Sequence, residues 1–186
     1  MNVQLPVHMD KPAFLAWLQG REGRYELAHG RVVMMVGASR GHGILVMNIA
    51  SILRAQLEAR EWTVLADFGL DLGAETLRYP DIVVDPAGGA AGDYTATAPA
   101  VIAEVLSPST ADVDLGDKAA EYLQLPSLSA YLVFAQREPK AWVWMRGANG
   151  FPPAPSVIVG YDKVIHVATL KLVLPLGAVY AGVENG

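Results

Sequence analysis

The feature that most constrains the fold is an apolar run, "AVIAEVL", at residues 100–106. Val, Ile and Leu on successive positions are typical of a strand that is buried on both faces. Glu104 stands in the middle of this run. An ionised carboxylate buried there costs several kcal/mol unless a cation or hydrogen-bond donors compensate its charge. The run therefore predicts a buried central strand, and the rest of the chain has to supply a partner for Glu104.

Helical periodicity and alternating apolar residues divide the rest of the chain into helices and strands. Helices are predicted over residues 10–19, 39–60 and 112–125. Strands are predicted over residues 25–36 (a hairpin around His29 and Gly30), 62–73, 77–85, 100–106, 130–136, 140–146, 156–160 and 163–174. This order predicts an α/β (α+β) fold in which one central sheet is flanked by helices.

Composition narrows the class of protein. The chain has 186 residues, of which 52% are hydrophobic and 18% charged, so we expect one domain, residues 1–186, with a substantial core. The absence of cysteine excludes disulfides and thiolate metal sites. The chain starts without a signal-peptide pattern and has no apolar run of about 18 residues, so we expect a cytoplasmic protein that does not enter a membrane.

The net charge of −5 and the pI near 5.3 argue against a strongly basic nucleic-acid-binding surface. They leave open a weak or metal-dependent contact with a phosphate backbone.

A second carboxylate accompanies Glu104. Asp81 lies directly before the apolar run at residues 82–84, and Pro80 precedes it. If the two strands pair, the two acids can face each other across the sheet. Two close carboxylates share a proton or hold a cation, and Mg²⁺ binds through one or two carboxylates together with water. The alternative is that Asp81 caps a strand start while Glu104 pairs with an arginine such as Arg78.

Lys118 offers a cation for this pair. It borders the apolar face of the helix predicted over residues 112–125, so its ammonium could reach the two carboxylates. The alternative is a lysine whose stem lies on the surface and whose charge stays in water, which is the commoner situation.

These residues resemble a known family. "RYPDIVVDP", "VIAEVLSPST" and "DLGDKAAEYLQL" followed by "AYLVFA" are similar to the Uma-type restriction-endonuclease-like family of the PD-(D/E)XK nuclease superfamily. "YELAHGRVVMMV" and "GHGILVMNIASILRAQL" resemble its opening, so the resemblance runs from about Tyr25 to about Arg146. It implies a restriction-endonuclease-like core, with a central mixed β-sheet, flanking helices and additional β-hairpins.

The resemblance also implies a function and a site. Asp81 and Glu104 would hold Mg²⁺ or Mn²⁺, and Asp81, Glu104 and Lys118 would be the catalytic residues of an endonuclease that hydrolyses phosphodiester bonds in DNA. The superfamily's lysine usually lies two residues after the glutamate, where this chain has Leu106. In this family the following helix supplies it, which matches Lys118. A catalytically degenerate member that binds nucleic acid or protein is the alternative, and a purely structural or interaction protein is a further one.

Two accessory candidates are Glu26 and His42. The resemblance places a similar histidine near the site, although a solvated histidine at a helix start would look the same. Nuclease sites often recruit an acid from N-terminal elements, but pairing of Glu26 with Arg31 within the hairpin is the preferred alternative.

Two further groups have structural interpretations. Residues 107–110, "SPST", are predicted to cap the turn after the Glu104 strand. Trp142 and Trp144 share one face of a predicted strand and are expected in the core or in a homodimer contact.

Overall fold

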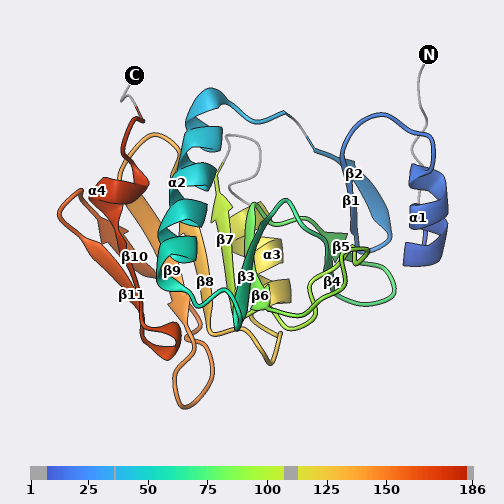
Figure 1. Ribbon diagram of the computed structural model, residues 1–186. Coiled ribbons are helices and arrows are strands. Elements are labelled where there is room, and N and C mark those ends of the chain that lie inside the picture. Colours follow the sequence, from blue (N-terminus) through green and yellow to red (C-terminus); the bar gives the residue numbers. More distant parts are fainter. Residues whose placement is uncertain (1–7, 36, 107–112, 184–186) are drawn as a thin grey trace. The chain divides into compact units, whose positions relative to one another are not determined.

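The computed structural model describes residues 8–35, 37–106 and 113–183 (Figure 1). The chain forms two compact units, one from residues 1–37 with 69–79 and a larger one from residues 38–68 with 80–186. Each unit is described by itself, and the assignment of residues 1–186 to a single domain stays a prediction.

The smaller unit consists of one helix and a four-stranded sheet. Helix α1 (Lys11–Leu18) begins at Asp10, whose side chain accepts a hydrogen bond from the N–H of Ala13. The strands are β1 (Tyr25–Ala28), β2 (Arg31–Met34), β4 (Leu70–Asp71) and β5 (Leu77–Arg78), in the order β2-β1-β5-β4. His29 and Gly30 have φ of 47° and 76°, so both adopt the left-handed conformation that a two-residue hairpin turn requires.

The larger unit is built on a six-stranded mixed sheet in the order β10-β9-β8-β7-β6-β3. The pairing of β7 with β8 is parallel and the other pairings are antiparallel. Its strands are β3 (Trp62–Ala66), β6 (Ile82–Pro86), β7 (Val101–Val105), β8 (Ala130–Phe134), β9 (Lys140–Met145) and β10 (Ser156–Val159). This mixed sheet with its helices confirms the fold class predicted from the sequence.

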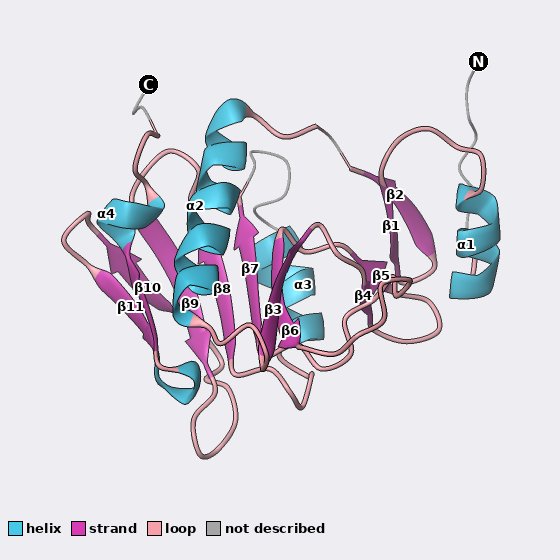
Figure 2. Cartoon of the chain, viewed as in Figure 1, coloured by secondary structure: helices cyan, strands magenta, loops and turns pink. Residues whose placement is uncertain are grey.

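Helices lie on opposite sides of this sheet. Figure 2 shows α2 (Arg40–Gln56) on one side and α3 (Lys118–Tyr122) on the other. All five residues of β7 are buried, as expected for a strand covered on both faces. Because side chains alternate along a strand, the residues that face α2 are separated by residues that face α3.

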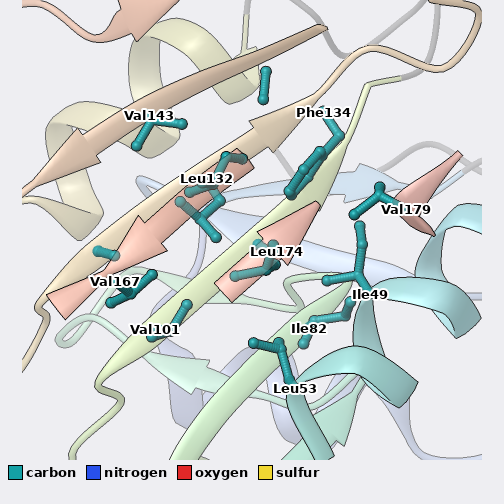
Figure 3. Packing of buried hydrophobic residues seen from close by; sticks show 14 of the residues in the cluster. Ile49, Leu53, Ile82, Val101, Leu132, Phe134, Val143, Val167, Leu174 and Val179 are labelled. Carbon is teal, nitrogen blue, oxygen red and sulfur yellow. The ribbon is translucent and has the colours of Figure 1, made fainter. Parts of the chain in front are cut away.

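The main core fills the space between the sheet and α2. Leu45, Ile49 and Leu53 of α2 pack with every second residue of β7, namely Val101, Ala103 and Val105. The hairpin of β11 (Val164–Val167) and β12 (Leu172–Pro175) and the short helix α4 (Leu176–Val179) complete the same cluster, which Figure 3 shows from close by. This packing leaves the alternate face of β7, with Glu104, to the side of α3.

Several predicted elements are shorter than expected or divided. The strand predicted over residues 62–73 ends at Ala66, because Asp67 turns the chain with a φ of 52°, and β4 pairs in the other sheet. The strand predicted over residues 77–85 divides around Pro80, which lacks an N–H for strand pairing. The strand predicted over residues 163–174 is a hairpin, with a 3₁₀ turn at Ala168–Leu170 and Lys171 at a φ of 55°.

The predicted helices also differ in detail. The helix expected to reach residue 60 ends at Gln56. The helix predicted from residue 112 begins as a π-helix, Val113–Asp117, and continues as α3. Within the described ranges, every helix is too short or too polar to cross a membrane.

Candidate active site

Glu104 is buried and bonded on both carboxylate oxygens. Only 3% of the residue is exposed. Its Oε1 accepts hydrogen bonds from Nζ of Lys118 at 2.9 Å and from the hydroxyl of Tyr122 at 3.3 Å. Its Oε2 accepts one from the backbone N–H of Asp81 at 3.2 Å. These three partners explain how a glutamate can occupy an apolar strand.

Asp81 lies beside Glu104 because β6 and β7 pair antiparallel. The register places Ile82 opposite Ala103, and one step further along each strand brings the two acids next to each other. Oδ2 of Asp81 accepts a hydrogen bond from the N–H of Val105 at 2.8 Å and lies 3.1 Å from Nε2 of His42. The side chain of Asp81 is 20% exposed, so it is the acid of the pair that solvent reaches.

Lys118 is buried and connects two acids. Its Nζ lies 2.9 Å from Oε1 of Glu104 and 3.1 Å from Oδ1 of Asp114, and only 7% of its side chain is exposed. Lys118 is therefore not a surface lysine with its charge in water. The alternative partner of Glu104, Arg78, instead lies 3.4 Å from Glu26 in the smaller unit.

Asp114 and Tyr122 complete this cluster, although the sequence analysis did not select them as site residues. Asp114 is 2% exposed and stands one helical turn before Lys118, in the π-helix. The i,i+4 spacing of an acid and a lysine in "DLGDK" was the available signal for Asp114. Tyr122 repeats that spacing after Lys118, but its aromatic ring favoured its interpretation as a core residue.

Aromatic rings support the cluster from the sheet. The hydroxyl of Tyr131, on β8, donates a hydrogen bond to the carbonyl of Asp114 at 2.8 Å. The ring of Tyr131 packs edge-on against Tyr122 at 5.2 Å and stacks on Trp144 at 5.4 Å. Trp144 is thus a core residue, while Trp142 is half-buried and has Nζ of Lys140 4.7 Å from its ring centre.

Burial determines the ionisation of Glu104. Removal from water, together with the nearby acids Asp81 and Asp114, raises the pKa of this carboxyl to about 8 against the opposing charge of Lys118. At pH 7 and without a further cation, the cluster therefore favours a protonated Glu104.

The two accessory candidates lie in different units. His42, in the first turn of α2, contacts Asp81 and so belongs to the cluster geometrically. Glu26 lies in β1 of the smaller unit, where its carboxylate contacts Arg78 and accepts a hydrogen bond from the N–H of Tyr79 at 2.9 Å. Their functional roles stay predictions, and the predicted cap at residues 107–110 lies outside the described residues.

The donor set fits a divalent cation such as Mg²⁺. Asp81, Glu104 and Asp114 bring three carboxylates into a cluster with one lysine, and carboxylate oxygens are the ligands that Mg²⁺ prefers. Among the described residues, no hydrogen bond reaches Oδ1 of Asp81. In the part of the chain that the structure describes, no three His, Cys, Asp or Glu side chains are arranged to hold one metal ion together, so the three acids of the cluster do not all ligate it. This is compatible with Mg²⁺, which usually keeps several water ligands.

Comparison with known proteins defines the class to which this fold belongs. The structure resembles the crystal structure of a protein from Anabaena variabilis described as "a putative nuclease belonging to DUF820". The TM-score is 0.77 at 16% sequence identity, and the match covers 93% of this chain and 98% of that one. The two proteins therefore share a fold over almost their whole lengths.

The sequence identifies the family. The chain belongs to the Uma2 family, described as "Putative restriction endonuclease", which matches residues 12–177. One uncharacterized protein of Synechocystis sp. is 31% identical over 116 residues, which is 60% of this chain and 66% of the relative, slightly under two thirds of its length. A second uncharacterized protein of Synechocystis sp. is 23% identical over 141 residues, 74% of each chain. The family predicted from the sequence is confirmed.

Proposed function

We propose that this protein is an endonuclease that hydrolyses phosphodiester bonds in DNA with Mg²⁺ or Mn²⁺ bound to Asp81 and Glu104. The observation that carries the proposal is the charge of the cluster: it gathers three acids, Asp81, Glu104 and Asp114, around one lysine, whose ammonium group contacts two of them. A buried cluster with excess negative charge favours binding of a cation. The family description and the fold support the same class of chemistry.

Each residue of the cluster has a role in this proposal. Asp81 and Glu104 hold the cation, and the N–H of Val105 and the imidazole of His42 fix the Asp81 carboxylate that receives it. The cation supplies a Lewis acid that activates water and stabilises charge on the scissile phosphate. Lys118 orients the attacking water or stabilises the developing negative charge.

The direct test is cleavage of plasmid and single-stranded DNA by the wild-type protein with Mg²⁺, Mn²⁺ or EDTA. Glu104→Ala and Asp81→Ala are the test variants. Asp162→Ala is the control, because Asp162 is an acid whose side chain is 74% exposed and pairs with its neighbour Lys163. We expect metal-dependent cleavage that the control retains and both test variants lose.

Two results would contradict the proposal. Cleavage that persists in EDTA or in folded Glu104→Ala protein would exclude this cluster as the catalytic centre. DNA binding without cleavage that survives both substitutions would support the alternative of a catalytically degenerate binding module.

The proposed homodimer is a separate question. Strand β10 is an outer strand of the six-stranded sheet, and its Val157 and Val159 are more than half exposed. Exposed apolar side chains on such a strand favour association. Light scattering on the protein as it elutes from a size-exclusion column should give twice the mass of one chain if the dimer forms. A measured mass of one chain would exclude the dimer.

A further inference from the structure

We propose that Asp114 is a positioning residue that takes over the ammonium group of Lys118 when a divalent cation binds to Asp81 and Glu104. The inference rests on the proposed metal-dependent function. It assigns a role to a buried acid that this function does not otherwise use.

The geometry gives the ammonium group of Lys118 two carboxylate partners. Nζ lies 2.9 Å from Oε1 of Glu104 and 3.1 Å from Oδ1 of Asp114, so a small rotation of the lysine side chain changes its main partner. Lys118 donates a well-aligned hydrogen bond to Glu104. Among the described residues, no aligned hydrogen bond reaches the buried Oδ1 of Asp114, which therefore can accept one.

Charge explains why the lysine should move. Without a metal, the ammonium lies between two buried carboxyl groups, those of Glu104 and Asp114. A divalent cation on Glu104 repels an ammonium a few ångströms away. A buried ammonium without a counter-ion is costly, and Lys118 cannot reach water without leaving its buried position. Asp114 provides the counter-ion that allows Lys118 to stay charged next to the cation.

The structure holds Asp114 in place for this role. The hydroxyl of Tyr131 binds its carbonyl at 2.8 Å, and the π-helix places its side chain one turn before Lys118. The backbone of Asp114, from which its carboxylate projects, is therefore held by β8 as well as by its own helix. Without this carboxylate, Lys118 would pair more strongly with Glu104 and would compete with the metal for it.

Binding of Mn²⁺ alone tests the role without measuring cleavage. The electron paramagnetic resonance signal of free Mn²⁺ gives the affinity for the wild-type protein, Asp114→Asn, Lys118→Met and the double variant. Asp117→Asn is the matched control, because Asp117 is exposed and lies on the same helical segment. We expect Asp114→Asn to weaken Mn²⁺ binding at least about tenfold, and the control to change it less than about twofold.

The double variant separates an effect through Lys118 from a direct one. If Asp114 acts through Lys118, Asp114→Asn should have no further effect in the Lys118→Met background. Equal weakening in both backgrounds would mean that Asp114 acts on the metal through its own charge, which would overturn the positioning role.

A measurement on the wild-type protein covers the case that Asp114→Asn does not fold. The ¹⁵Nζ signal of Lys118, identified by its absence in Lys118→Met, should move on addition of Mg²⁺ and remain protected from exchange with water. Loss of that protection would show that the ammonium is released to solvent and would overturn the role of Asp114.

The same titrations separate the two proposals. A wild-type protein that binds no Mn²⁺ overturns the proposed function together with the role of Asp114. Wild-type binding that Asp114→Asn retains at full strength overturns only the role of Asp114.

Discussion

Replacement of Tyr131 by phenylalanine should destabilise the protein more than the same replacement of Tyr122. The two rings are both fully buried and lie 5.2 Å apart, and each loses one hydroxyl. Tyr131 donates to the carbonyl of Asp114 at 2.8 Å. Tyr122 donates to Oε1 of Glu104 at 3.3 Å, where Lys118 also donates. The pair of variants therefore compares two acceptors in one environment.

The expected magnitudes follow from what each acceptor retains. The carbonyl of Asp114 is left short of a donor in a buried site, which costs about 1–3 kcal/mol in the free energy of unfolding. Oε1 of Glu104 keeps its bond to Lys118, so Tyr122→Phe should cost about 0.5–1 kcal/mol. The aromatic packing is retained in both variants because phenylalanine keeps the ring.

Urea unfolding followed by far-ultraviolet circular dichroism measures both values. Circular dichroism is preferred to fluorescence because Trp144 stacks on Tyr131 and its emission would change with the substitution. The slope of the unfolding free energy against urea concentration should stay constant, while the urea concentration at the midpoint of unfolding falls. A smaller loss for Tyr131→Phe than for Tyr122→Phe would refute the argument that the Tyr131 hydroxyl fixes the π-helix.

Three further predictions concern pH, a buried ion pair and a helix cap. Burial raises the pKa of Glu104 to about 8, so below that pH a binding metal must displace a proton from Glu104. The affinity for Mn²⁺ should therefore rise up to about tenfold per pH unit between about pH 5.5 and 7.5. An affinity that does not change with pH would contradict this. Glu26→Gln removes the charge of a carboxylate that faces the buried Arg78 and should lower the free energy of unfolding by about 3 kcal/mol in urea titrations. A loss below about 1 kcal/mol would exclude a strong pair. Asp10→Ala removes the N-cap of α1 and should cost about 1 kcal/mol, measured in the same way, and an unchanged midpoint would show that the cap is dispensable.

Much of the fold could be predicted because its signals are local. The periodicity of α2, the cap at Asp10 and the turn at His29 and Gly30 each depend on residues close together in the sequence. The divided strands were missed because the pairing of β4 in a different sheet depends on distant residues. No local pattern distinguishes the continuous strand predicted over residues 62–73 from two strands, β3 and β4, that are separated by a turn at Asp67.

The site shows the same division between local and distant signals. Asp81 and Glu104 stood out because acids are rare in apolar strands. Lys118 was selected through the family resemblance, since its spacing alone also fits a surface lysine. The contact of His42 with Asp81 depends on how α2 packs against the sheet, and the backbone of Asp114 is bonded by a hydroxyl from β8, which is distant in the sequence.

The hydrogen bonds between the two central acids have a consequence for mutagenesis. The N–H of Asp81 binds the Glu104 carboxylate, and the N–H that follows Glu104, that of Val105, binds the Asp81 carboxylate. Each acid is thus oriented by the backbone next to the other, and both N–H donors remain when either side chain is replaced. Alanine at one position should therefore leave the other carboxylate with its backbone donor. A single variant then reports the loss of one carboxylate rather than of two.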